Sequence, residues 1–329
     1  MNTKRWVALI IAVVLVVVSI GFKAVTTFTS IILSDQLNLD SSYMDEEIIQ
    51  DGSPQERIAV INLNGTIQNI ETPPLATAGY NHSFLLDSID TAAEDPTVQA
   101  IVLKVDSPGG GVTESAEIHR KITELQADYD KPVYVSMGNT AASGGYYVSA
   151  PADKIFANES TLTGSIGVIM QSMNFSGLAE KYGIEFNTIK SGKHKDIMSP
   201  TREMTKEENK IMQSMIDEMY DEFVDVIVEG RDLSEEHVRE IGDGRVYTGK
   251  QAVEVDLVDE IGSFEDTINE LMEDYDLNDA QVIQYDLGPG YWTQFLMSAK
   301  NIFDGDSNEI KTIMNLISES DQPRAMYLY

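Results

Sequence analysis

The chain has 329 residues, of which 42% are hydrophobic, enough to bury a core in one large domain or two modest ones. It has no cysteine, which excludes disulfides, thiolate catalysis and cysteine metal sites. The 23 basic and 54 acidic residues leave a formal net charge of -31, which disfavours nucleic acid as a partner.

The first residues predict a membrane anchor. A basic segment, Met1–Arg5, precedes residues 6–22, which carry no charge and are rich in Val, Ile and Leu. This length fits the ~17 to 25 residues that cross a bilayer better than the ~7 to 15 of a cleavable signal. Because only Lys23 follows closely, we expect a single-pass protein of the cell membrane, with a cytoplasmic N-terminus and an extracytoplasmic remainder. A cleaved signal peptide is the alternative.

Composition and periodicity divide the chain into four parts. Residues 1–23 form the cytoplasmic end and anchor, 24–57 a polar stalk or linker, 58–290 the main domain, and 291–329 a C-terminal helical segment and tail. Within the main domain short apolar runs alternate with helical patterns, which is typical of an α/β fold with largely parallel, buried strands. Strands are predicted at residues 58–63, 100–105, 132–137, 154–157, 166–170 and 186–190.

A glycine-rich turn follows the strand predicted at 100–105. Asp106-Ser-Pro-Gly-Gly-Gly leads into a helical pattern, and its glycines free backbone N–H groups to bind an oxyanion or a phosphate. Phosphate is disfavoured because no Lys-Ser/Thr follows at the spacing of a P-loop. A plain tight turn is the other interpretation.

Ser143 is the candidate nucleophile. It lies in Ala141-Ala-Ser-Gly-Gly, directly after an apolar strand, where small neighbours let backbone and substrate approach a hydroxyl on a sharp turn. An ordinary Ser-Gly-Gly turn is the alternative. Further along, Ser165 stands between Gly164 and Ile166-Gly167, where its hydroxyl could hold a catalytic amine or simply belong to a strand-entry turn.

A serine nucleophile needs a base. Of the four histidines, His82 is predicted in a polar loop and His119 and His237 on charged helices, where they would be solvated. His194 lies in the glycine-containing segment Ser191-Gly-Lys-His-Lys-Asp, but a triad through it is the weaker hypothesis. Lys195 is the better base if a pocket keeps its amine uncharged, and Lys193 competes with it because both would face one side of a strand.

Two capping boxes mark later helices. Thr205 and Glu208 open a long amphipathic helix that runs to Gly230, and Thr248 with Gln251 opens a short one. The methionines on the long helix are typical of a core or a subunit interface.

Four segments in order carry a resemblance to a known family. Asp106-Ser-Pro-Gly-Gly-Gly, Asn139-Thr-Ala-Ala-Ser-Gly-Gly-Tyr-Tyr, Thr163-Gly-Ser-Ile-Gly-Val and Ser191-Gly-Lys-His-Lys-Asp resemble motifs of the signal peptide peptidase A family of bacterial membrane serine peptidases. The resemblance covers approximately residues 56 to 275. The chain departs from the family at Asp256, where glycine is usual, but aspartate tolerates the left-handed conformation expected there.

The resemblance implies a role for each matching residue. Ser143 would be the nucleophile and Lys195, not Lys193, the general base of a Ser-Lys dyad. Ser165 would orient Lys195, and the N–H groups of Gly110 and Gly144 would form the oxyanion hole. The implied fold is the ClpP/crotonase-like spiral, without metal or cofactor.

The resemblance also implies partners. The substrates would be remnant signal peptides and other unfolded apolar peptides, and residues 6–22 would contact membrane lipid. Relatives form homo-oligomeric rings in which neighbouring units complete the Ser-Lys pair, so an isolated protomer is expected to be inactive.

Two rivals to a peptidase are a catalytically inactive, membrane-tethered binding scaffold and a crotonase-like acyl-CoA enzyme. The second would need a basic nucleotide pocket, which so acidic a chain does not suggest. The tail Arg324-Ala-Met-Tyr-Leu-Tyr is apolar, and a further hypothesis is that it reaches the site as a self-ligand.

Overall fold

The computed structural model describes residues 44–69, 80–288 and 325–329. Nearly all of them belong to one unit that comprises Glu46–Tyr285 and the final strand. The anchor predicted at residues 1–23 and the helical segment predicted after residue 290 lie outside the described residues. In the three described ranges, no helix is both long and apolar enough to cross a membrane.

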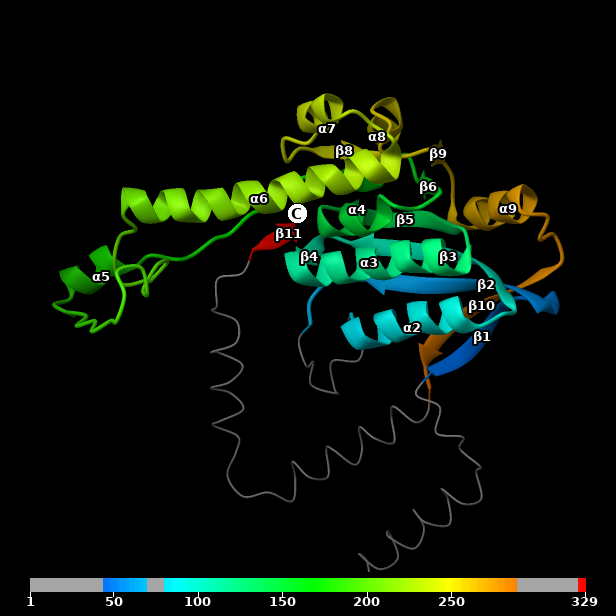
Figure 1. Ribbon diagram of the computed structural model, residues 1–329, viewed down its shortest axis with the longest axis horizontal. Coiled ribbons are helices and arrows are strands. Elements are labelled where there is room, and N and C mark those ends of the chain that lie inside the picture. Colours follow the sequence, from blue (N-terminus) through cyan, green and yellow to red (C-terminus); the bar gives the residue numbers. More distant parts are fainter. Residues whose placement is uncertain (1–43, 70–79, 289–324) are drawn as a thin grey trace, which may run out of the picture. The chain divides into compact units, whose positions relative to one another are not determined.

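A mostly parallel sheet forms the centre of the unit (Figure 1). Its strands lie in the order β1 (Met44–Gln50), β10 (Ala280–Leu287), β2 (Ser53–Asn64), β3 (Val98–Ser107), β5 (Val133–Ala142), β6 (Lys154–Ala157) and β9 (Glu260–Ile261). The short strand β7 (Leu162–Gly164) pairs parallel with the end of β5 and antiparallel with β8 (Val246–Thr248). Separately, β4 (Gly109–Gly111) pairs antiparallel with β11 (Met326–Leu328).

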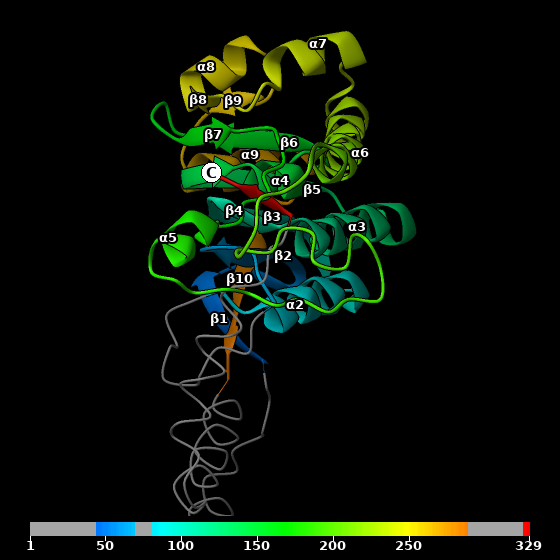
Figure 2. The same ribbon diagram turned by 90° about the vertical axis from the view of Figure 1, so that its left-hand side faces the viewer.

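Helices cover both faces of the sheet. One face packs against α9 (Phe264–Asp274), whose Ile268 and Leu271 join Ile58 and Val102 in a buried cluster. Successive strand residues point to opposite faces, so Ala59 on β2 and Ile101, its partner on β3, are buried on the other face. There α2 (His82–Glu94) and α3 (Val112–Tyr129) lie side by side (Figure 2). The expected α/β architecture with largely parallel strands is therefore confirmed.

The helical predictions in the second half of the chain agree with the structure. The long helix α6 (Lys206–Arg231) and the short α8 (Gly249–Glu254) begin at the predicted capping boxes, and both reciprocal bonds of each box are present. Asp256 has the expected left-handed backbone, with φ of 60°. The remaining helices are α4 (Gly144–Ser149), α5 (Ser176–Lys181) and α7 (Glu235–Ile241).

Two strand predictions were wrong. Residues 166–170 form only an isolated bridge at Ile169, and residues 186–190 form no strand. Residues 166–170 are an apolar run, whereas residues 186–190 also contain Asn, Thr and Lys, are exposed and pair with no neighbouring strand. The described part of the predicted stalk, residues 44–57, contains β1 and the beginning of β2.

A projecting segment carries these exposed apolar residues. We call residues 171–205, which include α5, the arm; it extends with the first turns of α6 away from the sheet (Figure 1). Exposed large apolar side chains on the arm are those of Met173, Phe175, Leu178, Tyr182, Ile184, Phe186 and Ile189. So many on one segment are typical of a surface that another chain covers.

Candidate active site

Three of the four sequence motifs meet where β3, β5 and β7 end. The carboxylate of Asp106, at the end of β3, accepts hydrogen bonds from the backbone N of Thr140 at 3.0 Å and from Nδ2 of Asn139 at 3.2 Å. These bonds join the glycine-rich turn to the segment that carries Ser143. Because parallel strands end at one edge of a sheet, distant residues gather there.

Ser143 occupies a strained turn between β5 and α4. Its backbone has φ of 53° and ψ of -116°, a conformation that L-residues rarely adopt. Its N–H donates to the carbonyl oxygen of Gly164 at 2.7 Å, and its own carbonyl accepts from N of Tyr147 at 2.8 Å. The side chain is buried and its Oγ has no hydrogen-bond partner. The turn thus presents a free hydroxyl in the way a serine nucleophile requires.

Ser165 lies next to this turn. Ala142 pairs with Gly164 across β5 and β7, so the two serines directly follow paired residues. Ser165 also has a positive φ, 50°, and its N–H donates to the carbonyl of Arg245 at 2.8 Å. The structure therefore brings the candidate nucleophile and its candidate helper together.

Glycines at 109, 110 and 144 let several backbone segments approach one another closely. A methyl group built on Gly144 would lie 3.0 Å from N of Gly110 and 2.7 Å from Oγ of Ser115. One built on Gly109 would lie 2.6 Å from N of Gly144. The two amide groups expected to form an oxyanion hole are thus close to one another, and side chains there would close the space between them.

The final strand occupies this region. β11 pairs with β4 so that Tyr327 is opposite Gly110, and N of Tyr329 donates to the carbonyl of Pro108 at 2.9 Å. On its other edge β11 exchanges two 3.0 Å hydrogen bonds between Met326 and Ile169. The tail therefore lies on the glycine turn, and its role as a self-ligand stays a prediction.

Tyr327 packs into an aromatic cluster next to the glycine turn. A methyl group built on Gly109 would lie 2.1 Å from the carbonyl oxygen of Tyr327 and 2.6 Å from N of Gly144. This carbonyl and this amide are therefore neighbours. The ring is fully buried, stacks on Tyr147 with centroids 4.9 Å apart and packs on Phe223 at 4.6 Å. Its hydroxyl donates to the carbonyl of Met219 at 3.1 Å. An aromatic pocket therefore lies beside the glycine turn.

Lys195 does not join this group within one chain. It lies on the arm, where its side chain is exposed, whereas Oγ of Ser143 is buried without a partner. Lys193 is also exposed and pairs with Glu207. The fourth motif is therefore separate from the other three in a single protomer.

Arg202 fixes the loop that carries Lys195. Its guanidinium binds both carboxylate oxygens of Asp196 at 2.7 and 2.8 Å, and both oxygens of Glu208 at 2.6 and 2.8 Å. Glu208 is buried and also closes the capping box of α6 with Thr205. Hydrogen bonds from Arg202 hold the pKa of both carboxyls well below their usual range. Through Arg202, Asp196, the residue after Lys195, is connected to Glu208 of α6.

The histidines take no part in a triad at Ser143. His194 lies 3.6 Å from carboxylate oxygens of Glu207 and Glu208. The prediction of a solvated loop for His82 was wrong, because it begins α2 and is buried, with Tyr80 and Glu117 on its two ring nitrogens at 2.5 and 3.0 Å. His119 packs edge-on against Tyr147, and burial lowers its pKa.

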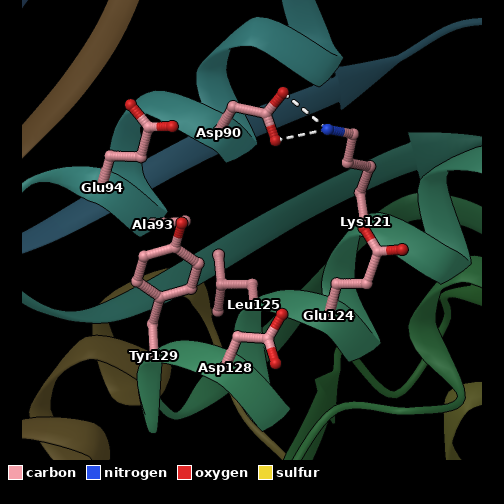
Figure 3. A pocket seen from close by; sticks show the side chains of 8 residues that line it. All are labelled: Asp90, Ala93, Glu94, Lys121, Glu124, Leu125, Asp128 and Tyr129. Carbon is pink, nitrogen blue, oxygen red and sulfur yellow. Dashed lines mark hydrogen bonds and ion pairs between the residues drawn. The ribbon is translucent and has the colours of Figure 1, made fainter.

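Elsewhere on the surface, a polar pocket lies between the last turns of α2 and α3 (Figure 3). Lys121 donates there to both carboxylate oxygens of Asp90 at 2.6 Å. The ends of α3 are some 25 Å apart at 1.5 Å per residue, so this pocket is distinct from the glycine turn at its beginning. Among the described residues, no group of three or more acidic or histidine side chains is placed to hold a metal ion.

Sequence reasoning missed Ser115, Arg202 and the aromatic pocket. Ser115 and Tyr147 follow a glycine run by a few residues, but only burial shows that they line the site. Arg202 is one of eight charged residues in the range 193–208, where sequence alone does not determine which of them pair.

Comparisons with known proteins decide the family. The chain is 38% identical to a protein of Enterococcus faecium named "Putative signal peptide peptidase SppA", over 100% of this chain and 99% of that protein. The chain belongs to the signal peptide peptidase A family. A profile described as Peptidase family S49 matches residues 126–278, which include Ser143, Ser165 and Lys195.

Two other relatives are longer than this chain. Protease 4 of Haemophilus influenzae is 31% identical over 83% of the chain, which spans 46% of that protein. The chloroplastic serine protease SPPA of Arabidopsis thaliana is 34% identical over 63% of the chain, which spans 31% of that protein. The chain is therefore a serine peptidase, as the sequence predicted.

Proposed function

We propose that the chain is an endopeptidase that cleaves remnant signal peptides and similar unfolded, apolar peptides at the membrane through a dyad of Ser143 and Lys195. The observation that carries this proposal is β11 on β4. This pairing supports the proposal because an extended apolar strand lies on the glycine turn, with Tyr327 opposite Gly110 and its ring stacked on Tyr147. A substrate bound in the same way would add a strand to β4.

The proposed reaction begins with the uncharged amine of Lys195, which takes the proton of the Ser143 hydroxyl while Oγ attacks the scissile carbonyl carbon. The carbonyl electron pair moves to oxygen, and the N–H groups of Gly110 and Gly144 stabilise that charge. Lys195 then gives the proton to the leaving amine, and an acyl-enzyme remains on Ser143. Water, deprotonated by Lys195, hydrolyses the acyl-enzyme, and Ser165 orients the amine throughout.

We propose that the dyad forms between protomers of a homo-oligomeric ring. Two observations support this arrangement: Oγ of Ser143 is buried without a partner, and Lys195 stands on an arm with many exposed apolar side chains. A neighbour's arm placed beside this turn would supply the Ser143 hydroxyl with a partner and would cover the exposed apolar side chains.

The same proposal includes the anchor and the fold type. Residues 6–22 would hold the protein in the cell membrane with the catalytic domain outside the cytoplasm, where released signal peptides are accessible. The mostly parallel sheet and the glycine turn are consistent with a ClpP/crotonase-like spiral.

Digestion of a synthetic signal peptide by the full-length protein tests this function. We expect cleavage by the wild type, none by Ser143→Ala, and labelling of Ser143 by a serine-directed covalent probe. A wild type that forms oligomers but neither cleaves nor reacts with the probe would instead support the inactive scaffold.

A further inference from the structure

A second serine hydroxyl at the site has no partner. Ser115, in the first turns of α3, is fully buried, and its Oγ makes no hydrogen bond. Among the buried side-chain atoms without a partner in the described ranges, the two serine hydroxyls are those of Ser115 and Ser143. A buried hydroxyl without a partner costs free energy, so its presence needs a reason.

Other buried helical serines behave differently. Ser88 on α2 donates to the carbonyl of Phe84 at 2.7 Å, and Ser149 on α4 donates to that of Gly145 at 2.7 Å. This bond to the fourth preceding residue is the usual solution for a serine inside a helix. Ser115 does not make it, so its hydroxyl is available to another acceptor.

The position of Ser115 indicates that acceptor. A methyl group on Gly144 would meet Oγ of Ser115 at 2.7 Å and N of Gly110 at 3.0 Å, so the hydroxyl borders the same small space as the two amides. A methyl group on Gly109 would lie 2.1 Å from the carbonyl oxygen of Tyr327 and 2.6 Å from N of Gly144, so a peptide carbonyl is already present next to this group of glycines.

We propose that the Ser115 hydroxyl is a third hydrogen-bond donor to the oxyanion, beside the N–H groups of Gly110 and Gly144. The inference rests on the proposed function. When Ser143 attacks, the carbonyl oxygen gains a full electron pair, and Ser115 donates a hydrogen bond to it without losing its proton. When the intermediate collapses, the electron pair re-forms the carbonyl bond. A donor of this kind acts in the transition state and hardly on the bound substrate.

The test compares full-length Ser115→Ala with Ser88→Ala as a matched control. We expect Ser115→Ala to lower kcat roughly 10- to 100-fold with KM within about twofold of the wild type. A peptide aldehyde, which forms a tetrahedral adduct with Ser143, should lose affinity by the same factor. The corresponding peptide alcohol, which forms no adduct, should bind as before.

Stability gives the second measurement. Ser115→Ala removes a hydroxyl without a partner, so its midpoint of thermal unfolding should equal or exceed that of the wild type. Ser88→Ala breaks a satisfied hydrogen bond and should lower the midpoint while kcat is retained.

Three results would overturn the inference while Ser143→Ala is inactive: wild-type kcat in Ser115→Ala, equal losses for aldehyde and alcohol, or a lost kcat that accompanies a lowered midpoint. Turnover by Ser143→Ala would overturn the proposed function itself.

Discussion

At the residue scale, the backbone of Ser143 combines strain with function. Its positive φ costs on the order of 1–3 kcal/mol for a residue with a side chain, and pairing with Gly164 and α4 holds it in place. Glycine adopts this conformation freely but loses about 0.5–1 kcal/mol of backbone entropy. We expect Ser143→Gly to be about 1 kcal/mol more stable than Ser143→Ala in denaturant unfolding, with both variants inactive. Equal stability would show that the turn is unstrained.

The two lysines of the arm give a second prediction at this scale. Lys195→Ala should abolish peptide cleavage, because no other base is proposed for Ser143. Lys193→Ala should keep most of the wild-type kcat, because it loses an exposed pair with Glu207, and such pairs contribute ~0–1 kcal/mol. Steady-state kinetics on one peptide compares the variants. Equal losses in the two would contradict the choice of Lys195.

At the element scale, the proposed function implies that β11 competes with substrate for β4. A strand attached to the same chain has a high effective concentration, so it raises the apparent KM of any peptide that binds there. Deletion of residues 325–329 should lower KM with little change in kcat. Tyr327→Ala should act in the same direction and Leu328→Ala much less, since Tyr327 is fully buried and Leu328 is 38% exposed. An unchanged KM after the deletion would show that substrate binds elsewhere.

The arm gives a prediction with a pH dependence. Asp196 and Glu208 have a lowered pKa because of hydrogen bonds from Arg202, so the network stabilises the arm fully above the unfolded carboxyl pKa of ~4. This contribution is lost as the pH falls through the lower folded-state values. Arg202→Ala should therefore reduce hydrogen-exchange protection of the amides of Lys195 and Ser199 at pH 7, and the difference from wild type should shrink in strong acid.

Arg239→Ala is the matched control for the arm. Arg239 also binds two carboxylates, those of Glu235 and Asp221, but it belongs to α7 and contacts α6 instead of the arm. The hydrogen-exchange protection of the arm amides, those of Lys195 and Ser199, should be unchanged in this variant. Equal protection in the wild type and Arg202→Ala at pH 7 would refute the role of the network.

The elements also show how far sequence reasoning reaches. α6 was predictable because its capping box and its apolar spacing both act within a few residues. Residues 166–170 were mistaken for a strand because an apolar run does not reveal whether a neighbouring strand exists to pair with it. Residues 186–190 were mistaken for one although they are exposed and have no pairing partner. The three-residue strands β4 and β11 carry no periodic pattern, and only their mutual pairing defines them.

The candidate site shows the same difference between local sequence patterns, which can be read from the sequence, and contacts between distant segments, which cannot. Ser143, Gly110 and Gly144 could be proposed as site residues because their motifs follow predicted strands, and Ser165 because its motif resembles one of the family. The free hydroxyl of Ser115 and the burial of His82 depend on contacts between α2, α3 and the sheet, which sequence spacing does not give.

At the scale of the whole molecule, the account requires assembly. A single protomer leaves Ser143 without a base and the arm exposed, so activity should depend on the concentration of oligomer. Size-exclusion fractions should show turnover in the oligomer and none in the monomer. Full turnover in the monomer fraction would mean that Lys195 reaches Ser143 within one chain.

Mixed oligomers test the central claim most directly. Ser143→Ala and Lys195→Ala, each inactive alone, are co-expressed with different tags and purified through both, so that every particle contains both variants. If neighbouring protomers supply the two residues, each dyad takes Ser143 from one protomer and Lys195 from its neighbour. In an equal, random mixture, half of the dyads have an intact Ser143, and half of these also have an intact Lys195. Peptide cleavage should then return to about a quarter of the wild-type rate. Mixed particles with no recovered cleavage would contradict a dyad shared between protomers.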